Sequence, residues 1–176
     1  MLFNSEAWSN VSDRDMERLE LVDTSALKHL VAGHAKSNKV FYYLEFGVLM
    51  IRHVVMMRRL IYHHHIINRD NDEVIKKIYQ KQEESPCKGD WALLIKKDFE
   101  FIGEQINQNF ILNTSKKDYS KFIRNKVQSA AFESYLQLKG VSKKKMKDLK
   151  YDKLMIQNYL VSDQLSLEDK YLLSSL

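Results

Sequence analysis

The chain has 176 residues, of which 44% are hydrophobic, and a formal net charge of +5. This length suits one ordinary domain or two small ones, and the hydrophobic share excludes wholesale disorder. Only five glycines and one proline are present, too few for the many turns of a sheet protein, so the composition predicts helices.

The single cysteine and the interrupted apolar runs exclude further classes of protein. Cys87 is alone, so neither an intrachain disulfide framework nor a cysteine-based zinc site can form. No charged start leads into an apolar signal core, and Arg52, Arg58 and Arg59 interrupt the longest apolar run. The sequence therefore predicts an intracellular protein without a membrane span.

Positive charge is concentrated in two blocks. Residues 36–69 contain six basic residues and one acidic residue, and residues 116–153 contain twelve basic and four acidic residues. The remaining segments are mildly acidic. Localised positive charge of this kind indicates an anionic partner, whereas a uniformly basic chain would indicate only solubility.

The first third of the chain predicts three segments. Residues 3–10 are typical of an extended lead-in anchored by Trp8. A helix is predicted from Ser12 to Gly33, because early aspartates are followed by apolar residues at helical spacing. Ser37 is expected to cap a short helix that Gly47 closes.

The next predicted helix, from about residue 48 to residue 68, carries three arginines. Its apolar residues lie nearly all round the helix, which is typical of a buried helix. Buried charge needs a partner. This conflict between burial and charge makes the helix the most informative segment of the chain.

The remainder also predicts helices. Asp70 or Asn71 is expected to cap a helix that ends at Ser85, and Asp90 is expected near the cap of a helix that ends at Gly103. Ser115 is expected to cap a long helix that ends at Gly140. A lysine-rich connector, a short apolar-faced segment over 151–160 and a last helix capped by Ser166 follow. We therefore predict an all-α fold, an irregular bundle of about six to eight helices.

Six short motifs occur in the order found after the polymerase core of non-LTR (LINE-type) retrotransposon reverse transcriptases, and nearly the whole chain resembles that region. The motifs are Ser5-Glu6-Ala7-Trp8, Leu19-Glu20-Leu21-Val22-Asp23, Tyr43-Leu44-Glu45-Phe46-Gly47, Arg52 with Arg58-Arg59-Leu60, Lys88-Gly89-Asp90-Trp91, and Lys153-Leu154 with Asn158-Tyr159-Leu160. The resemblance implies a thumb-like helical segment over residues 1–69. A helical C-terminal segment over 70–176 would carry the basic block.

Three features depart from the family pattern. Met50 occupies a position where the family usually has proline, and Ala7 replaces a threonine. The chain also has no adjacent pair of aspartates, which the family uses to hold the metal ions of polymerisation. The resemblance therefore implies reverse-transcriptase ancestry without catalysis by this chain, as a fragment or a degenerate copy of such an element.

Arginine and lysine residues are the candidate contacts to nucleic acid. Arg52 and Arg59 are seven residues apart and share a helix face, and the arginine fork suits phosphate oxygens. The alternative is that they pair internally with carboxylates such as Glu45 or Asp23. The candidate phosphate contacts are Arg52, Arg58, Arg59, Lys116, Lys117, Lys143, Lys144, Lys145 and Lys147, and Lys121 and Arg124 extend the second positive block.

Other residue patterns predict no chemistry. Consecutive residues of a helix point about 100° apart, so His63-His64-His65 cannot converge on one metal ion. Tyr119, Phe122 and Tyr135 could stack on bases, but their helical spacing favours the core. We predict no catalytic residue, metal or cofactor.

Two functional hypotheses follow. The first is a non-catalytic helical segment that binds RNA or DNA, independently of sequence, beside a reverse-transcriptase core located elsewhere. The lysine-rich tract over 143–150 would suit this binding, or nuclear import, or simply a solvated loop. The second is a helical protein–protein interaction module, whose docking or dimer surface would be the apolar terminus around Leu172 and Leu173. A degenerate remnant with no maintained activity is a third alternative.

Overall fold

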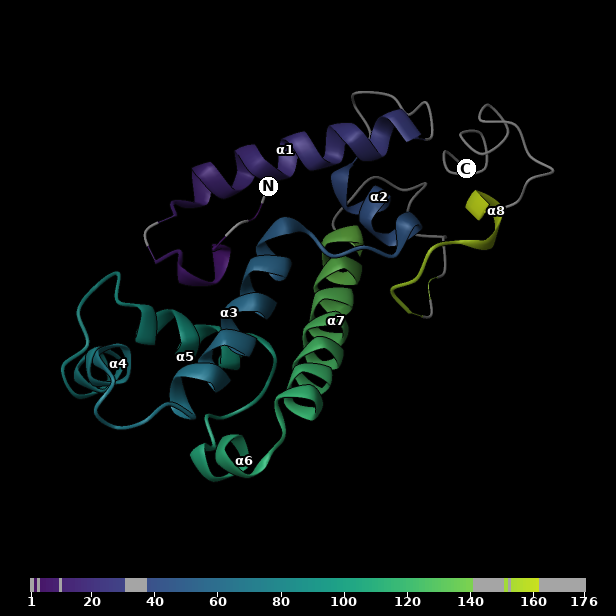
Figure 1. Cartoon of the computed structure of the whole chain (residues 1–176). Helices are drawn as coiled ribbons and strands as arrows, with labels where there is room; N and C mark the ends of the chain where they lie inside the picture. Colours follow the sequence, from purple (N-terminus) through teal and green to yellow (C-terminus); the bar gives the residue numbers. More distant parts are fainter. Residues whose placement is uncertain are drawn as a thin grey trace. The chain divides into compact units, whose positions relative to one another are not determined.

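The computed structural model describes residues 2, 4–9, 11–30, 38–140, 151 and 153–161. In these residues the fold is all-α (Figure 1), which confirms the predicted fold class. The only β pairing among them is an isolated bridge between Phe46 and Ile156. The described elements are a 3-10 turn, η1 (Ser5–Ala7), and the helices α1 (Asp13–Leu30), α2 (Lys39–Phe46), α3 (Ile51–Ile67), α4 (Val74–Glu84), α5 (Trp91–Phe101), α6 (Gln108–Asn113), α7 (Lys116–Gly140) and α8 (Asn158–Val161).

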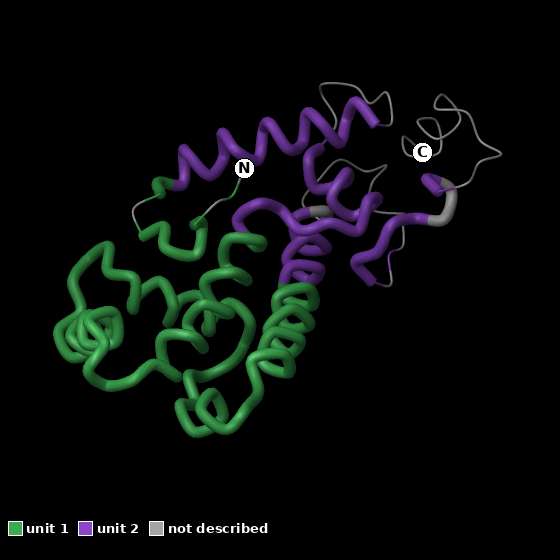
Figure 2. Tube along the Cα trace, in the orientation of Figure 1, with its two compact units in different colours: residues 1–12, 53–130 green, residues 13–52, 131–176 purple. Residues whose placement is uncertain are grey.

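The chain divides into two compact units (Figure 2). Unit 1 holds Met1–Ser12 and His53–Ala130, and unit 2 holds Asp13–Arg52 and Ala131–Leu176. The unit boundaries fall inside or at the edges of helices, so α3 and α7 contribute residues to both units. The expected boundary between residues 69 and 70 lies within unit 1, because packing groups segments that are distant in sequence.

Unit 2 has a core built from α2, the segment that follows it and the last part of α7. Gly47 ends α2 in the left-handed conformation, with φ of 61°, as its position in the sequence predicts. A Cβ at this position would collide with the Met155 backbone, so the site also requires glycine sterically. The buried core residues are Val40, Tyr43, Leu44, Met50, Ala131 and Tyr135.

Met50, at a position where the family that the sequence resembles usually has proline, donates a hydrogen bond that proline could not. Its backbone N–H donates to the buried Tyr135 hydroxyl at 2.6 Å. Proline has no N–H. The backbone N–H at position 50 therefore has a structural role in unit 2.

Unit 1 is centred on the part of α3 that begins at His53. Leu60 and Ile66 of this helix are fully or almost fully buried, and Arg58 is the one exposed residue between Ile51 and Ile67. The prediction of an all-round buried helix is therefore confirmed. The other buried apolar residues of unit 1 are Val55, Ile67, Tyr79, Ala92, Ile95, Phe99, Ile102, Ile111, Tyr119, Ile123 and Val127.

Several predicted boundaries were wrong. Residues 5–7 form the 3-10 turn η1 where an extended lead-in was expected. The side chain of Asn38 caps α2, its oxygen accepting from the Val40 N–H at 3.0 Å, and α4 begins after Glu73, where neither Asp70 nor Asn71 is the cap. Helix α6 was missed altogether. It is only six residues long and begins at an Asn107 side-chain cap.

Other predicted boundaries were correct. Ser115 caps α7, since its hydroxyl accepts from the Asp118 N–H at 3.2 Å and donates to the Asp118 carboxylate at 2.6 Å. The expected helix end at Gly33, the expected helix start at Ser166 and the apolar terminus lie outside the described residues. Among the described helices none is long and apolar enough alone to cross a membrane. Only α2 and α3 taken together are long and apolar enough, by length and composition alone, and a 58° bend separates them.

Candidate nucleic-acid interface

Arg52 is paired inside unit 2. Its Nε donates to Oε1 of Glu20 at 2.5 Å and its Nη2 donates to Oε2 at 3.1 Å. Lys39 donates to the same carboxylate at 3.0 Å. Burial alone would raise the pKa of Glu20, but Arg52 and Lys39 together hold that pKa below its ordinary value.

Arg59 is paired inside unit 1. Its Nε donates to Oδ2 of Asp98 at 2.6 Å and its Nη2 to Oδ1 at 3.0 Å, while Nη1 reaches the Trp8 carbonyl at 3.3 Å. Only 12% of the Arg59 side chain and 6% of the Asp98 side chain are exposed. Burial raises the pKa of Asp98, and the contact with Arg59 opposes that shift.

These contacts favour internal pairing over phosphate contact for Arg52 and Arg59. The carboxylates named as partners were wrong, however. Glu45 accepts instead from the Tyr151 hydroxyl, and Asp23 accepts from the Tyr43 hydroxyl at 2.9 Å. The true partners, Glu20 and Asp98, are brought to the arginines by tertiary packing.

Arg58 lies on the outside of α3 and has a different environment. Its Nη1 donates to the Leu2 carbonyl at 2.5 Å and lies 3.4 Å from the Ser5 hydroxyl. These partners are neutral, so its positive charge is not cancelled by a contact. Arg58 is therefore the arginine of α3 best placed to meet an anion.

Arg58 lines a groove of about 510 Å³ together with Lys116 and Arg124 of α7. Lys116 and Arg124 are eight residues apart on α7, about two helical turns, and both are exposed. Arg124 Nε lies 3.5 Å from the Ser120 hydroxyl. The groove thus gathers three cations from two helices, and the remaining lining residues are Glu6, Ile61, Tyr62 and His65.

His65 is the titratable ring of this groove. Burial, then the charges of Arg69 and Lys116, lower its pKa against the opposing effect of Glu73. The ring accepts a hydrogen bond from Arg69 Nε at 3.1 Å, and Arg69 also pairs with Glu73 at 2.8 Å. His65 is therefore neutral at pH 7, and the groove charge there comes from Arg58, Lys116 and Arg124 against Glu6.

The other predicted contact residues do not join the groove. Lys117 is exposed next to Lys116 but does not line the groove. Lys143, Lys144, Lys145 and Lys147 lie outside the described residues. Their contribution to binding stays a prediction from the sequence.

The three consecutive histidines have three different environments. His63 Nε2 lies 2.9 Å from the Tyr79 hydroxyl, and His64 Nε2 lies 2.9 Å from the Thr114 carbonyl. His65 contacts Arg69, as described above. Among the described residues, no group of three or more His, Cys, Asp or Glu side chains could hold a metal ion.

The groove contains residues that sequence reasoning missed. Tyr62 and His65 were not recognised as site residues, and Arg124 was noted only as an extension of the basic block. A signal was available, because Arg58, Tyr62 and His65 recur at spacings of four and three residues and so share a helix face. Arg52 and Arg59, seven residues apart, lie on a different face of the same helix.

Two of the quoted motifs meet in unit 1. The Trp91 indole N–H donates to the Glu6 carbonyl at 2.8 Å, which ties the start of α5 to η1. Asp90 precedes α5, and its carboxylate accepts from the Cys87 N–H at 2.6 Å.

No protein-family model, no curated protein and no solved structure matches this chain.

Proposed function

We propose that this chain binds single-stranded nucleic acid, RNA or DNA, independently of sequence, through phosphate contacts in the Arg58–Lys116–Arg124 groove. The single observation that supports the proposal is the convergence of these three cations around one groove. Arginine and lysine neutralise phosphates without reading sequence. Tyr62 adds an aromatic face of the kind on which bases stack.

The proposal includes the role suggested by the resemblance. The chain would act as a non-catalytic helical segment from the region after a reverse-transcriptase core, and polymerisation would belong to that core on another segment. Support for this ancestry comes from the structural roles of the motif residues. Gly47 ends α2, and Trp91 of one motif contacts Glu6 of another.

A salt titration of binding tests the proposal. Fluorescence anisotropy with labelled 20-nucleotide RNA and DNA would give affinity as a function of salt. For single strands, log K is expected to fall with log salt with a slope of about −0.7 per phosphate contacted. Affinity that is absent at low salt, or that does not change with salt, would contradict the proposal.

A charge-matched pair of variants locates the site. The double variant Arg58→Gln with Lys116→Gln removes two positive charges from the groove. It should weaken binding, and the slope of log K against log salt should become shallower by the contribution of about two phosphate contacts. Lys96→Gln with Lys97→Gln removes the same charge from exposed positions of α5 that do not line the groove. Equal effects of the two double variants would mean that the groove is not the site.

One observation favours a second candidate, a helical protein–protein interaction module. Leu21 and Val22, adjacent on α1, are 66% and 64% exposed. Exposed apolar pairs of this kind occur at association surfaces. Sedimentation at several concentrations tests it: self-association that Leu21→Glu abolishes would support this candidate, and a monomer at every concentration would contradict dimer formation.

A further inference from the structure

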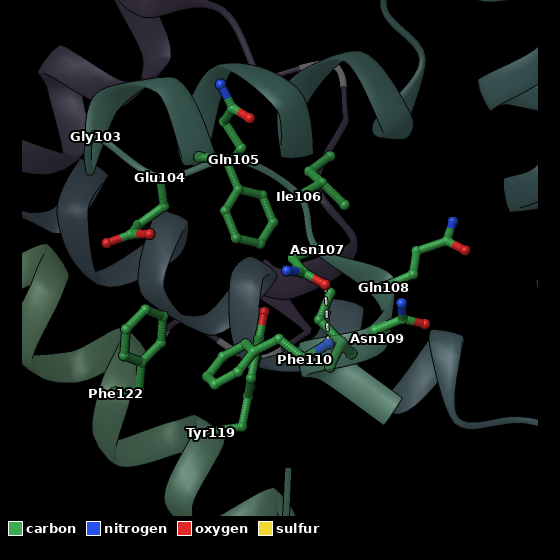
Figure 3. A pocket seen from close by; sticks show the side chains of 12 residues that line it. Gly103, Glu104, Gln105, Ile106, Asn107, Gln108, Asn109, Phe110, Tyr119 and Phe122 are labelled. Carbon is green, nitrogen blue, oxygen red and sulfur yellow. Dashed lines mark hydrogen bonds between the residues drawn. The ribbon is translucent and has the colours of Figure 1, made fainter. Parts of the chain in front are cut away.

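A second pocket in unit 1 is lined by residues other than those of the basic groove. It has a volume of about 910 Å³ and is bounded by the segment 103–109, helix α6 and the first turns of α7 (Figure 3). The proposed phosphate contacts do not use it. Its wall combines aromatic rings with a run of side-chain amides.

One polar group in the pocket lacks a partner. The Tyr119 residue is 1% exposed, and its hydroxyl has no hydrogen-bond partner among the described residues. Figure 3 shows this hydroxyl pointing toward the middle of the lining side chains. A buried hydroxyl without a partner is unfavourable, so a ligand that supplied a hydrogen bond there would gain affinity.

Aromatic rings form one side of the pocket. Phe110 is 40% exposed, and its ring meets that of Phe122 edge to face, with centroids 5.2 Å apart. Phe110 also lies next to Tyr119, at 6.2 Å between centroids. An exposed ring held by two neighbours offers a flat surface that loses little freedom when a planar ligand stacks on it.

Side-chain amides also line the pocket, at its exposed rim. Gln105, Asn107, Gln108 and Asn109 all line the pocket and are exposed. The Asn107 oxygen accepts from the Phe110 N–H at 3.0 Å, which orients that amide and leaves its NH₂ group as a donor. Amides present both a donor and an acceptor, as do the edges of nucleobases.

The pocket carries no unbalanced charge. Its one carboxylate, Glu104, pairs with Lys126 at 2.5 Å, and Lys126 also lies 5.7 Å from the centre of the Phe122 ring. A neutral site with a flat aromatic wall and amide edges suits a neutral, planar ligand rich in hydrogen-bonding groups. Free phosphate or a carboxylate would find only the Lys126 cation there, which Glu104 already neutralises.

We propose that this pocket binds an unstacked nucleobase of the strand whose phosphates contact the basic groove. The inference rests on the proposed function, which it deepens by adding a base contact to the phosphate contacts. Lys116 and Tyr119 are one turn apart on α7, so a phosphate contact and a base contact fall within neighbouring positions of one helix. The base stacks on Phe110, and the Tyr119 hydroxyl and the rim amides bond its edge.

The experiment compares strands with and without bases. An eight-nucleotide RNA that contains 2-aminopurine, whose fluorescence reports stacking, is compared with an abasic strand of equal length. The abasic strand should bind about tenfold more weakly than the normal strand, the typical effect of losing a stacked base. Equal affinity for the two strands would overturn the proposal.

Variants locate the contact. Phe110→Ala removes the exposed ring, and Tyr119→Phe removes only the hydroxyl while keeping the buried ring; each should weaken binding of the normal strand and leave binding of the abasic strand unchanged. Leu112→Ala is the matched control, an exposed residue of the same helix that does not line the pocket. If Leu112→Ala weakens binding as much as Phe110→Ala does, the pocket is not the site.

Free nucleosides separate this inference from the proposed function. Adenosine, guanosine, cytidine and uridine lack phosphate, so their binding, followed by nuclear magnetic resonance, tests the pocket alone. Nucleoside binding that Tyr119→Phe weakens, without salt-dependent binding of the strand, would leave the pocket supported and the proposed function contradicted. Salt-dependent binding of the strand with no nucleoside binding would leave the groove supported and overturn the pocket.

Discussion

The Arg59 guanidinium holds the Asp98 carboxylate through two parallel hydrogen bonds, from Nε at 2.6 Å and from Nη2 at 3.0 Å. Its neighbour Arg58 contacts only neutral oxygens of the N-terminal segment and lines the basic groove. Two consecutive arginines therefore have opposite roles. One stabilises the core of unit 1, and we propose that the other contacts phosphate.

Arg59→Ala should lower the free energy of unfolding by about 3 kcal/mol or more, because it leaves the buried Asp98 without its cation. Urea denaturation measures this change. Arg58→Ala is the matched control and should cost less than about 1 kcal/mol, since Arg58 is exposed. In binding assays on folded protein the order should reverse, with only Arg58→Ala weakening RNA binding. Equal stability losses for the two variants would contradict the assigned roles.

Met50→Pro should destabilise unit 2, although the family that the sequence resembles usually has proline at this position. The substitution removes the N–H that donates to the buried Tyr135 hydroxyl, a loss of about 1–3 kcal/mol. Reduced freedom of the unfolded chain would return only about 0.4–1 kcal/mol. Thermal unfolding followed by circular dichroism measures the difference. Met50→Leu keeps the N–H and a similar volume, so it should cost less than about 1.5 kcal/mol.

Glu20→Gln should destabilise unit 2 in a pH-dependent way. Because Arg52 and Lys39 lower the folded-state pKa of Glu20, the unfolded chain binds more protons as the pH falls below the ordinary value of 4.5. The stabilisation is therefore complete above that pH and is lost as the pH falls through the folded-state pKa. At pH 7 we expect Glu20→Gln to lower the free energy of unfolding by about 2 kcal/mol. This value is smaller than for a fully buried ion pair, because Arg52 and Lys39 are partly exposed. Glu17→Gln, on the exposed face of α1, should change the stability by less than about 0.5 kcal/mol, and a pH-independent effect of Glu20→Gln would contradict the pairing.

His63 should make unit 1 less stable in acid. Burial lowers the pKa of His63 from 6.5 to about 3, with a smaller effect from His64. Between these values the unfolded chain binds a proton that the folded chain does not, so the free energy of unfolding falls as the pH falls from about 6.5 toward 3. Chemical denaturation at pH 7, 6, 5 and 4 measures the slope.

Two variants isolate this contribution. His63→Gln should flatten the slope between pH 6 and pH 4, even though it also lowers stability by loosening the contact with Tyr79. His29→Gln, which removes an exposed histidine from the last turn of α1, is the matched control for the loss of a histidine. An unchanged slope in His63→Gln would contradict the assignment of acid sensitivity to this residue.

The hydrogen bonds around His63 also determine its tautomer. The Tyr79 hydroxyl donates to the Glu83 carboxylate at 2.7 Å, so its oxygen is left to accept from His63 Nε2 at 2.9 Å. The neutral ring therefore carries its proton on Nε2. His63 Nδ1 has no partner among the described residues, and protonating it would bury a positive charge beside aromatic rings.

Most of the helical structure could be predicted from the sequence, because periodicity and capping are local effects. The all-round apolar pattern identified α3 as buried, Gly47 marked the end of α2, and Ser115 marked the start of α7. Helix α6 could not be predicted in the same way. It is short, and its one buried apolar residue, Ile111, gives no periodic pattern.

The site could be predicted only in part. Arg58, Lys116 and the basic character around Arg124 were recognised from charge, but charge alone did not separate them from Arg52 and Arg59. Neighbouring residues on a helix point about 100° apart, so one of two adjacent arginines meets the core and the other meets solvent. The tertiary packing against each face of the helix decides which of the two arginines meets the core.

By itself, the sequence determined the fold class, the burial of α3 and the position of the positive charge, since these follow from composition and periodicity. The tertiary structure alone decided which arginines are neutralised. Glu20 lies 32 residues from Arg52 and Asp98 lies 39 residues from Arg59, and packing brings each pair together. It also decided that the Tyr119 hydroxyl, which has no partner among the described residues, lies at a pocket. The walls of that pocket come from the end of α5, the segment after it, α6 and α7, and local sequence patterns do not specify how these neighbouring elements pack.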